Sequence, residues 1–503
     1  MSEKRAKTGR GRKQRASALL ARNDNIALWV LLSSLFVVIL NETLMNVALP
    51  VLMREMHVTA VTGQWLTSGF VLTMSVVIPI TGTLIQRLTT RRLYFFAMFA
   101  FLTGTLICLV APNFWVLLSG RVVQAVGTAI MMPLLTHTTI TVVPKEVRGR
   151  IMGRTGTIVA IAPALGPTTS GIILQYWHWR MLFAVMVPIV LLAIFVAWRV
   201  LRNVGAVRVY RIDALSVLLS VLGFGGLVYG LASFGHGDVG VHAAEAMQLP
   251  PWVPLAAGAV AIALFIWRQQ TLQKADRALL DTRVFTVRTY RVGSILMWCV
   301  MTSLFSSIMI LPLYGSRVLG LETLNIGLLL LPGGIFMGIA APIVGRMVDK
   351  YGSIPVLMPG IAIVALALWL LSRVAPDTQI WYLYVAQLTM SIGLSMCFSP
   401  IFAAALGSLP TYRSAYGSAM MSTLQQVAAA LGIAMFVTIY ALVAAGEVSG
   451  GAVQAEAEAA GARAAYFVAA CIMTVATFIV PFMKEKKRSN PVTTDTGAIV
   501  IPS

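Results

Sequence analysis

The sequence contains few charged residues and few cysteines. Only 11% of its 503 residues are charged, while 58% are hydrophobic. An average soluble protein has about 25% charged residues, so this composition excludes an ordinary water-soluble chain. The four cysteines, Cys108, Cys299, Cys397 and Cys471, follow no metal-ligand spacing, and we expect neither a metal site nor disulfides. The sequence also lacks a GxxxxGK[ST] run, which argues against a nucleotide as the energy source.

Long apolar runs account for the composition. A membrane-spanning helix needs about 20 apolar residues, and the runs do not alternate in the manner of barrel strands. We therefore predict an all-α integral membrane protein with fourteen spans. Their approximate ranges are 26–52, 62–86, 92–112, 114–143, 152–175, 181–201, 212–234, 251–268, 290–314, 324–348, 353–373, 378–406, 414–445 and 464–483.

The net charge of +20 would suggest a nucleic-acid partner in a soluble protein, but here its distribution sets the topology. With the N-terminus inside, 32 Lys and Arg residues fall on the cytoplasmic side. The opposite side holds five, namely Arg54, Arg180, Arg317, Arg373 and Arg463. We expect both termini to be cytoplasmic and no cleaved signal peptide. The basic N-terminal arm, MSEKRAKTGRGRKQR, is then expected to contact anionic lipid headgroups rather than nucleic acid.

An internal repeat predicts two related halves. Residues 79–87, PITGTLIQR, align with residues 342–350, PIVGRMVDK, and an ALG triplet recurs at 164–166 and 430–432. Each half has six predicted spans, and two further spans lie between them. This is the parallel-repeat plan of the major facilitator fold, although duplicated helices that merely stack remain an alternative. The predicted units are 1–25 (basic tail), 26–201 (N-terminal bundle), 202–289 (inserted helix pair), 290–483 (C-terminal bundle) and 484–503 (C-terminal tail).

Acidic residues are scarce within the predicted spans. Of eighteen, only Glu42 lies deep in a span; Asp213 and Asp349 lie at cytoplasmic helix ends, and the remainder, Glu458 included, are assigned to loops or tails. Arg121 is the only comparably buried basic residue. A carboxylate at bilayer depth costs about 2.5 kcal/mol or more, so it is a functional candidate. We interpret Glu42 as a proton carrier, with a structural hydrogen bond to Asn46, one turn along the helix, as the alternative.

Several stretches together resemble the fourteen-span drug:proton antiporters of the major facilitator superfamily, in particular lincomycin-resistance-like members. They are NETLMNVALP at 41–50, LLSGRVVQAVGTAIMMP at 117–133, APALGPTTSG at 162–171 and WHWRMLFAVMVP at 177–188. The resemblance implies a role for Arg121 in proton coupling. Ser170 stands where a second glycine is usual in the third stretch.

The resemblance also implies residues that govern conformational change. The fifth predicted span, GRTGTIVAIAPALGPTTSG, is either a close-packing helix or a kinked rocking helix between the halves. The loop after the second span departs from the family pattern, because no acid follows Gly82. The repeat-related loop has Asp349. The conformational candidates are Gly82, Arg87, Gly166, Pro167, Gly171, Gly345 and Asp349.

Polar, aromatic and methionine residues within the spans are candidates for a substrate cavity. The main ones are Asn41, Asn46, Met45, Trp65, Gln124, Trp298, Gln387 and Gln425. Further wall candidates are Gln64, Phe70, Met131, Met132, Phe305, Met420 and Gln426. His137 is either a hydrogen-bonded helix-end residue or a proton relay.

Together with the resemblance, these observations predict a monomeric multidrug exporter in the bacterial inner membrane. It would expel lipophilic compounds such as lincosamides, including weakly cationic ones, in exchange for protons, with membrane lipids around it and no cofactor. Export of an endogenous lipid or envelope precursor is the alternative. A sensor or scaffold is disfavoured because the sequence has no sizeable soluble domain to transmit a signal.

Overall fold

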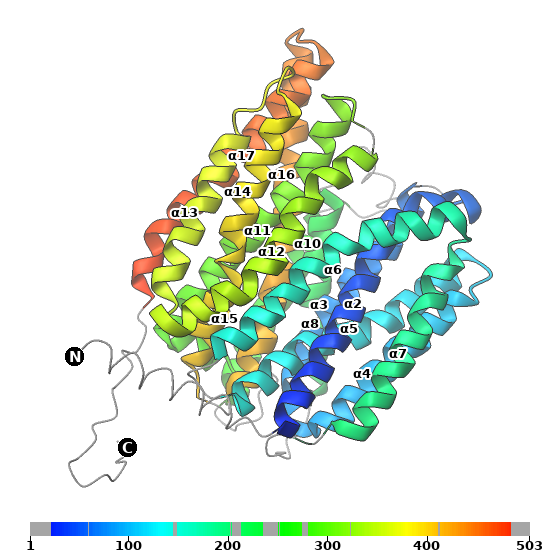
Figure 1. Ribbon diagram of the computed structural model, residues 1–503, viewed down its shortest axis with the longest axis vertical. Helices are drawn as coiled ribbons and strands as arrows, with labels where there is room; N and C mark the ends of the chain where they lie inside the picture. The colour runs from blue at the N-terminus through cyan, green and yellow to red at the C-terminus, as the bar shows by residue number, and fades with distance from the viewer. Residues whose placement is uncertain are drawn as a thin grey trace.

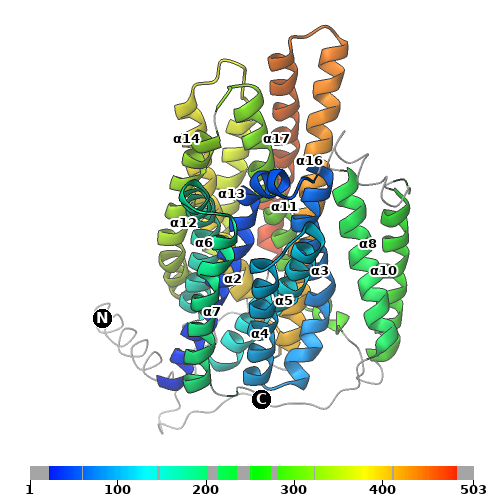
Figure 2. The same ribbon diagram turned by 90° about the vertical axis from the view of Figure 1, so that its right-hand side faces the viewer.

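The computed structural model describes residues 22–58, 60–143, 148–201, 203, 213–234, 250, 252–273, 280–321, 323–410 and 413–483. Over these ranges the chain is helical and contains no strand. Twelve of the helical segments are long and apolar enough to cross a membrane. The helices stand side by side in an elongated bundle (Figures 1 and 2).

The N-terminal half begins with α2 and ends with α7. Its helices are α2 (Arg22–Glu55), α3 (Ala60–Arg87), α4 (Thr90–Leu109), α5 (Phe114–Val142), α6 (Arg148–Tyr176) and α7 (Arg180–Val200). Local capping defines two of the starts. The Thr89 side chain accepts a hydrogen bond from the Arg92 backbone N–H at 3.3 Å, and Asn113 accepts one from Val116 at 3.0 Å.

The inserted pair and the C-terminal half follow. The pair consists of α8 (Ala214–Phe234) and α10 (Trp252–Gln273), and a short 3-10 helix, η2 (Thr282–Thr286), leads out of it. The C-terminal half contains α11 (Arg288–Arg317), α12 (Thr323–Tyr351), α13 (Ile354–Leu371), α14 (Ile380–Ser395), α15 (Phe398–Gly407), α16 (Ser414–Ser449), α17 (Gln454–Ile479) and η4 (Val480–Phe482).

The predicted span 378–406 corresponds to one candidate membrane span, Ile380–Gly407, but the helix within it is interrupted. Helix α14 ends at Ser395 and α15 begins at Phe398, with Met396 and Cys397 in a turn. Pro400 has no backbone N–H, so it cannot donate to the Met396 carbonyl four residues earlier. The missing hydrogen bond favours a break at this point, although α3 and α5 each contain a proline and stay continuous.

The last span starts earlier than predicted, which corrects the assignment of Glu458 to a loop. Helix α17 begins at Gln454 rather than near residue 464, because the alanine-rich run QAEAEAAGARAA favours helix. Glu458 is only 5% exposed on this helix. Glu42 is therefore not the only acid withdrawn from solvent.

Two large apolar cores correspond broadly to the two halves. One is built almost entirely from α2 to α7, and the other mainly from α11 to α17. The halves meet along two seams. Helix α6 packs against α12, as Figure 1 shows, and α3 packs against α16.

Glycines permit close contact at both seams. A Cβ on Gly153 of α6 would lie 2.5 Å from the Ala341 carbonyl of α12. A Cβ on Gly82 of α3 would lie 3.1 Å from the Ala419 Cβ of α16. The fifth predicted span is thus a helix that packs against the opposite half.

Candidate functional site

Glu42 lies on a segment of α2 that is fixed against α6. Thr43, the next residue, is within 3.4 Å of the Ala162 carbonyl, and a Cβ on Gly166 would collide with the Thr43 side chain. One turn further along α6, the Ser170 hydroxyl donates to the Leu44 carbonyl at 2.9 Å. These contacts hold the backbone around Glu42, whose side chain is half-buried. Ser170, which stands where the resemblance would place a second glycine, makes one of them.

Arg121 of α5 is 1% exposed and is oriented by neutral partners. Its guanidinium donates to the Gln124 side chain at 3.0 Å, and Gln124 in turn donates to Thr105 of α4 at 2.8 Å. The guanidinium carbon also lies 4.1 Å from the centroid of the Phe70 ring of α3. This cation–π contact and the hydrogen bond position the charge without neutralising it.

Glu42 and Arg121 interact through space but are not joined directly. Each contributes to the electrostatic environment of the other. Within the described ranges, no Glu42 oxygen lies within 4.0 Å of an Arg121 nitrogen, and Glu42 has no other ion pair. A carboxylate that is not held by a salt bridge can change its protonation state without first breaking one.

Four of the eight main predicted cavity residues pack within one half. Asn41 and Met45 are each 2% exposed, and the Asn41 amide nitrogen has no hydrogen-bond partner among the described residues. Gln124 is occupied by Arg121 and Thr105, as described above. Gln387 of α14 accepts a hydrogen bond from Ser307 of α11 at 3.1 Å. These positions therefore support the helix packing.

The two predicted tryptophans also lie elsewhere. Trp65 of α3 stacks on Tyr229 of α8, with ring centroids 5.7 Å apart, so it contacts the inserted pair. Trp298 on α11 is 39% exposed. The side chains of Asn46, Gln64 and Pro167 lie outside the described set. Helical periodicity could not have shown which face of each helix turns toward the interior.

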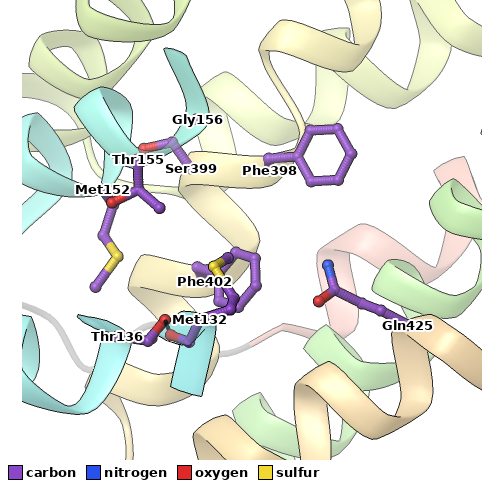
Figure 3. A pocket seen from close by; sticks show the side chains of 9 residues that line it. All are labelled: Met132, Thr136, Met152, Thr155, Gly156, Phe398, Ser399, Phe402 and Gln425. Carbon is purple, nitrogen blue, oxygen red and sulfur yellow. Dashed lines mark hydrogen bonds between the residues drawn. The ribbon is translucent and has the colours of Figure 1, made fainter. Parts of the chain in front are cut away.

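A small cavity does lie between the halves, and Figure 3 shows its wall. Helices α5 and α6 supply one side, and α15 and α16 supply the other. Its volume is about 30 Å³, room for a water molecule or two in this arrangement rather than a drug. The lining residues are Met132, Thr136, Met152, Thr155, Gly156, Phe398, Ser399, Phe402 and Gln425.

Only Gln425 and Met132 of this wall were among the predicted cavity residues. Met132 and Thr136 are one turn apart on α5, and Phe398 and Phe402 are one turn apart on α15. This spacing is a weak signal, because the same spacing occurs on every buried helix. The wall combines thioether, aromatic, hydroxyl and amide groups and contains no charged residue.

The predicted conformational residues divide by location. Gly82 and Gly345 lie in the seams between the halves; a Cβ on Gly153 would be 3.1 Å from the Gly345 Cα. Gly166 instead packs within the N-terminal half. Gly171 is exposed with no atom within 4 Å of its built Cβ, so it does not serve close packing here. Arg87 is exposed at the end of α3, and Asp349 is 5% exposed at the end of α12.

His137 joins the two halves. Its Nδ1 lies 2.9 Å from the Ser414 hydroxyl at the start of α16, and one turn along each helix the Ser418 hydroxyl is 3.4 Å from the Pro133 carbonyl. The C-terminal part of α5 is thereby closed against α16. This is a hydrogen-bonded helix-end position, as one of the two interpretations predicted.

Comparison with known proteins agrees with this architecture. The Major Facilitator Superfamily model matches residues 31–433. The chain is 36% identical to the uncharacterized MFS-type transporter YcnB of Bacillus subtilis, over 92% of this chain and 96% of that protein. It is also 36% identical to the lincomycin resistance protein LmrB of Listeria innocua, over 80% of this chain and 84% of that one.

The fold is also similar to that of a solved structure. The crystal structure of the human organic anion transporter MFSD10 superimposes with a TM-score of 0.65 at 13% identity, covering 91% of this chain and 99% of the other. At this identity the similarity concerns the fold alone. The described helices, the two packed halves and the match over residues 31–433 lead to one conclusion: the chain is a multi-pass membrane protein of the Major Facilitator Superfamily, a family of transporters.

Proposed function

We propose that the protein is a proton-coupled exporter of lipophilic drugs, with lincosamides among them. The observation that carries this proposal is the arrangement of Glu42 beside Arg121, in which a half-buried acid and a buried base interact without a salt bridge. The 36% identity to a lincomycin resistance protein supports the choice of substrate class. The uncharged wall of the cavity suits apolar ligands with a few hydrogen-bonding groups.

The exchange of protons for substrate follows from the net charge of Glu42 and Arg121. When Glu42 is ionised, its charge and that of Arg121 cancel, and a lipophilic or weakly cationic substrate can enter. When Glu42 takes up a proton, one net positive charge remains in a poorly solvated region, and that charge opposes a cationic substrate. Proton and substrate therefore compete, which is the requirement for antiport.

The proposed topology places fourteen spans in the bacterial inner membrane with both termini in the cytoplasm. Helices α6 and α8 are added to the twelve apolar segments described above. The His137–Ser414 and Ser418–Pro133 contacts then lie at the cytoplasmic side. The arrangement described here is accordingly assigned to a cytoplasm-closed state.

The test is transport in proteoliposomes loaded at acidic pH and diluted into alkaline buffer that contains labelled lincomycin. For inside-out molecules, proton efflux should drive accumulation of the antibiotic, and a protonophore should abolish it. A parallel set of vesicles carries a fluorescent phospholipid on one leaflet. Protonophore-insensitive movement of the phospholipid, with no accumulation of lincomycin, would contradict the proposal and favour lipid export.

A further inference from the structure

The inserted helix pair lies along one seam of the transporter. Its helices pack closely because a Cβ on Gly226 of α8 would lie 2.9 Å from the Gly258 Cα of α10. Helix α8 contacts both α3 of the N-terminal half and α16 of the C-terminal half. Figure 2 shows α8 and α10 together at one edge of the bundle. The inserted helix pair therefore contacts both the N-terminal and the C-terminal half, which must move relative to each other in a transport cycle.

A bidentate ion pair fixes the base of the inserted helices. Arg268 of α10 donates to both oxygens of Asp213, just before α8, at 2.7 and 2.8 Å. These hydrogen bonds lower the pKa of the Asp213 carboxyl below its usual range, so the pair stays ionised at physiological pH. Ser216 donates to the same carboxylate at 2.6 Å and accepts a hydrogen bond from Gln269 at 2.8 Å.

The polar connections continue from α10 into η2. The Gln269 side chain also accepts a hydrogen bond from the Leu280 backbone N–H at 3.1 Å, and Gln273 donates to Thr282 at 2.7 Å. Leu280 and Val284 are both fully buried in the core of the C-terminal half. Residues 280–284 are therefore attached to α10 by hydrogen bonds and to the C-terminal half by the burial of Leu280 and Val284.

Asp281 lies within this segment and faces α16. Its Oδ2 is 3.2 Å from the Arg413 Nε, and the two side chains are only 13% and 18% exposed. Its Oδ1 accepts a hydrogen bond from the Arg283 backbone N–H at 2.9 Å and so caps η2. Arg413 immediately precedes α16, and Ser414, the first residue of that helix, meets His137 of the opposite half.

We propose that Asp281 and Arg413 are positioning residues that hold the start of α16 in the cytoplasm-closed arrangement and thereby connect the inserted helix pair to the contact between the halves. The pair of helices moves with the C-terminal half, to which η2 and Arg413 attach it. Its contact with the N-terminal half is apolar packing: Trp65 stacks on Tyr229 with ring centroids 5.7 Å apart, and a Cβ on Gly225 would lie 3.7 Å from the Val76 side chain. The proposal rests on the transport cycle proposed above.

The test measures a distance across the cytoplasmic side. Spin labels are placed at Arg87→Cys on α3 and Lys350→Cys on α12, two exposed helix-end positions in different halves, after replacement of the four native cysteines. Pulsed electron resonance in lipid nanodiscs then gives the populations of closed and open arrangements. Asp281→Asn is the principal variant, because asparagine still caps η2 but has no charge.

We expect Asp281→Asn and Arg413→Gln each to raise the ratio of open to closed molecules by about fivefold, as loss of roughly 1 kcal/mol would. The double variant should fall short of the sum of the two single ones, because both remove the contact between these side chains; Asp281 also lies 4.0 Å from the Arg283 Nε, so the single variants need not be equal. Asp377→Asn, the same chemical change at an exposed loop site of the C-terminal half, should leave the distances unchanged. A wild-type distribution in Asp281→Asn, or an additive double variant, would overturn the inference.

The distance measurement requires neither substrate nor a proton gradient. If lincomycin is not transported while the distances shift as expected, the proposed function fails and the positioning role stands. If transport occurs and the distances do not shift, the positioning role fails alone. Thermal unfolding of each purified variant identifies any whose distances change because the fold is lost.

Discussion

Glu42 in the N-terminal half and Glu458 in the C-terminal half are both acids on membrane-spanning helices, but their surroundings differ. Glu458 accepts hydrogen bonds from the Tyr440 hydroxyl, from Gln454 at 3.0 Å and from Arg317 at 3.3 Å. These donors come from α16, α17 and α11. Glu42 has no ion pair within the described ranges, although Arg121 is near enough to influence it.

Under the proposed function, this difference would separate a structural acid from a reactive one. Protonation of Glu458 would forfeit an ion pair and leave its donors without an ionised acceptor, so its charge is stabilised in place. Protonation of Glu42 breaks no salt bridge. Burial alone therefore does not identify a proton carrier, and the number of partners is the more informative property.

The largest expected effect is that of Glu42→Gln. Removal of the titrating group should reduce pH-gradient-driven accumulation of lincomycin to the level of protein-free vesicles, while the purified protein remains folded. The measurement is uptake of labelled drug in proteoliposomes. Glu447→Gln, at an exposed position on α16, is the matched control and should transport normally. Full coupled transport by Glu42→Gln would remove the distinction between the two acids.

Arg121→Lys should have the next largest effect. Lysine retains the positive charge but lacks the planar group that contacts Phe70 and the geometry that reaches Gln124. A hydrogen bond from a charged group contributes roughly 1.5–3 kcal/mol, so we expect the exchange rate to fall at least about tenfold. The rate is measured in the same vesicles. An unchanged rate would mean that exchange at Glu42 needs only a positive charge at position 121 and not the orientation of the Arg121 guanidinium.

Glu458→Gln should change stability and leave exchange nearly intact. Because Arg317 is 57% exposed and can be solvated, we expect a loss of only about 1–2 kcal/mol in the free energy of unfolding, well below the roughly 3–5 kcal/mol for breaking a fully buried pair. A lower midpoint in thermal unfolding would register this loss. If drug exchange were instead lost at unchanged stability, Glu458 would have to be counted as a reactive acid.

The smallest effect is expected for Gln425→Leu in the cavity between the halves. A neutral hydrogen bond contributes roughly 0.5–1.5 kcal/mol, so the apparent affinity for a drug with amide or hydroxyl groups should weaken about threefold. A purely apolar dye of similar size should be unaffected. Competition of both compounds against labelled lincomycin provides the comparison. Equal changes for both would show that the residue shapes the cavity without hydrogen-bonding its contents.

The sequence could predict the helices because an apolar run of about 20 residues has one stable conformation in lipid, with every backbone group bonded internally. Glu42 and Arg121 could be singled out because charges at bilayer depth are rare. The residues around Arg121 could not be predicted. Phe70 and Thr105 lie on other helices, and their distance from Arg121 depends on how each helix is rotated about its axis. Thr136 and Phe402 were missed for the same reason.

The errors in the predicted boundaries have local causes. The start of α17 differs from the prediction because Glu456, Glu458 and Arg463 interrupt the apolar run, whereas helix propensity and the partners of Glu458 extend the helix across them. The interruption between α14 and α15 was missed because Pro400 lies three residues inside the second helix. Its effect is felt one turn earlier, at Met396.

The interruption between α14 and α15 affects where this span can bend. A continuous hydrogen-bonded helix resists bending along its whole length, whereas the turn at Met396 and Cys397 concentrates compliance at one point. Phe398, Ser399 and Phe402 are carried by the ten-residue segment beyond it, while Gln387 keeps the longer segment attached to α11. A change of angle at this turn would therefore move the part of the cavity wall formed by Phe398, Ser399 and Phe402, while α14 stays hydrogen-bonded to α11.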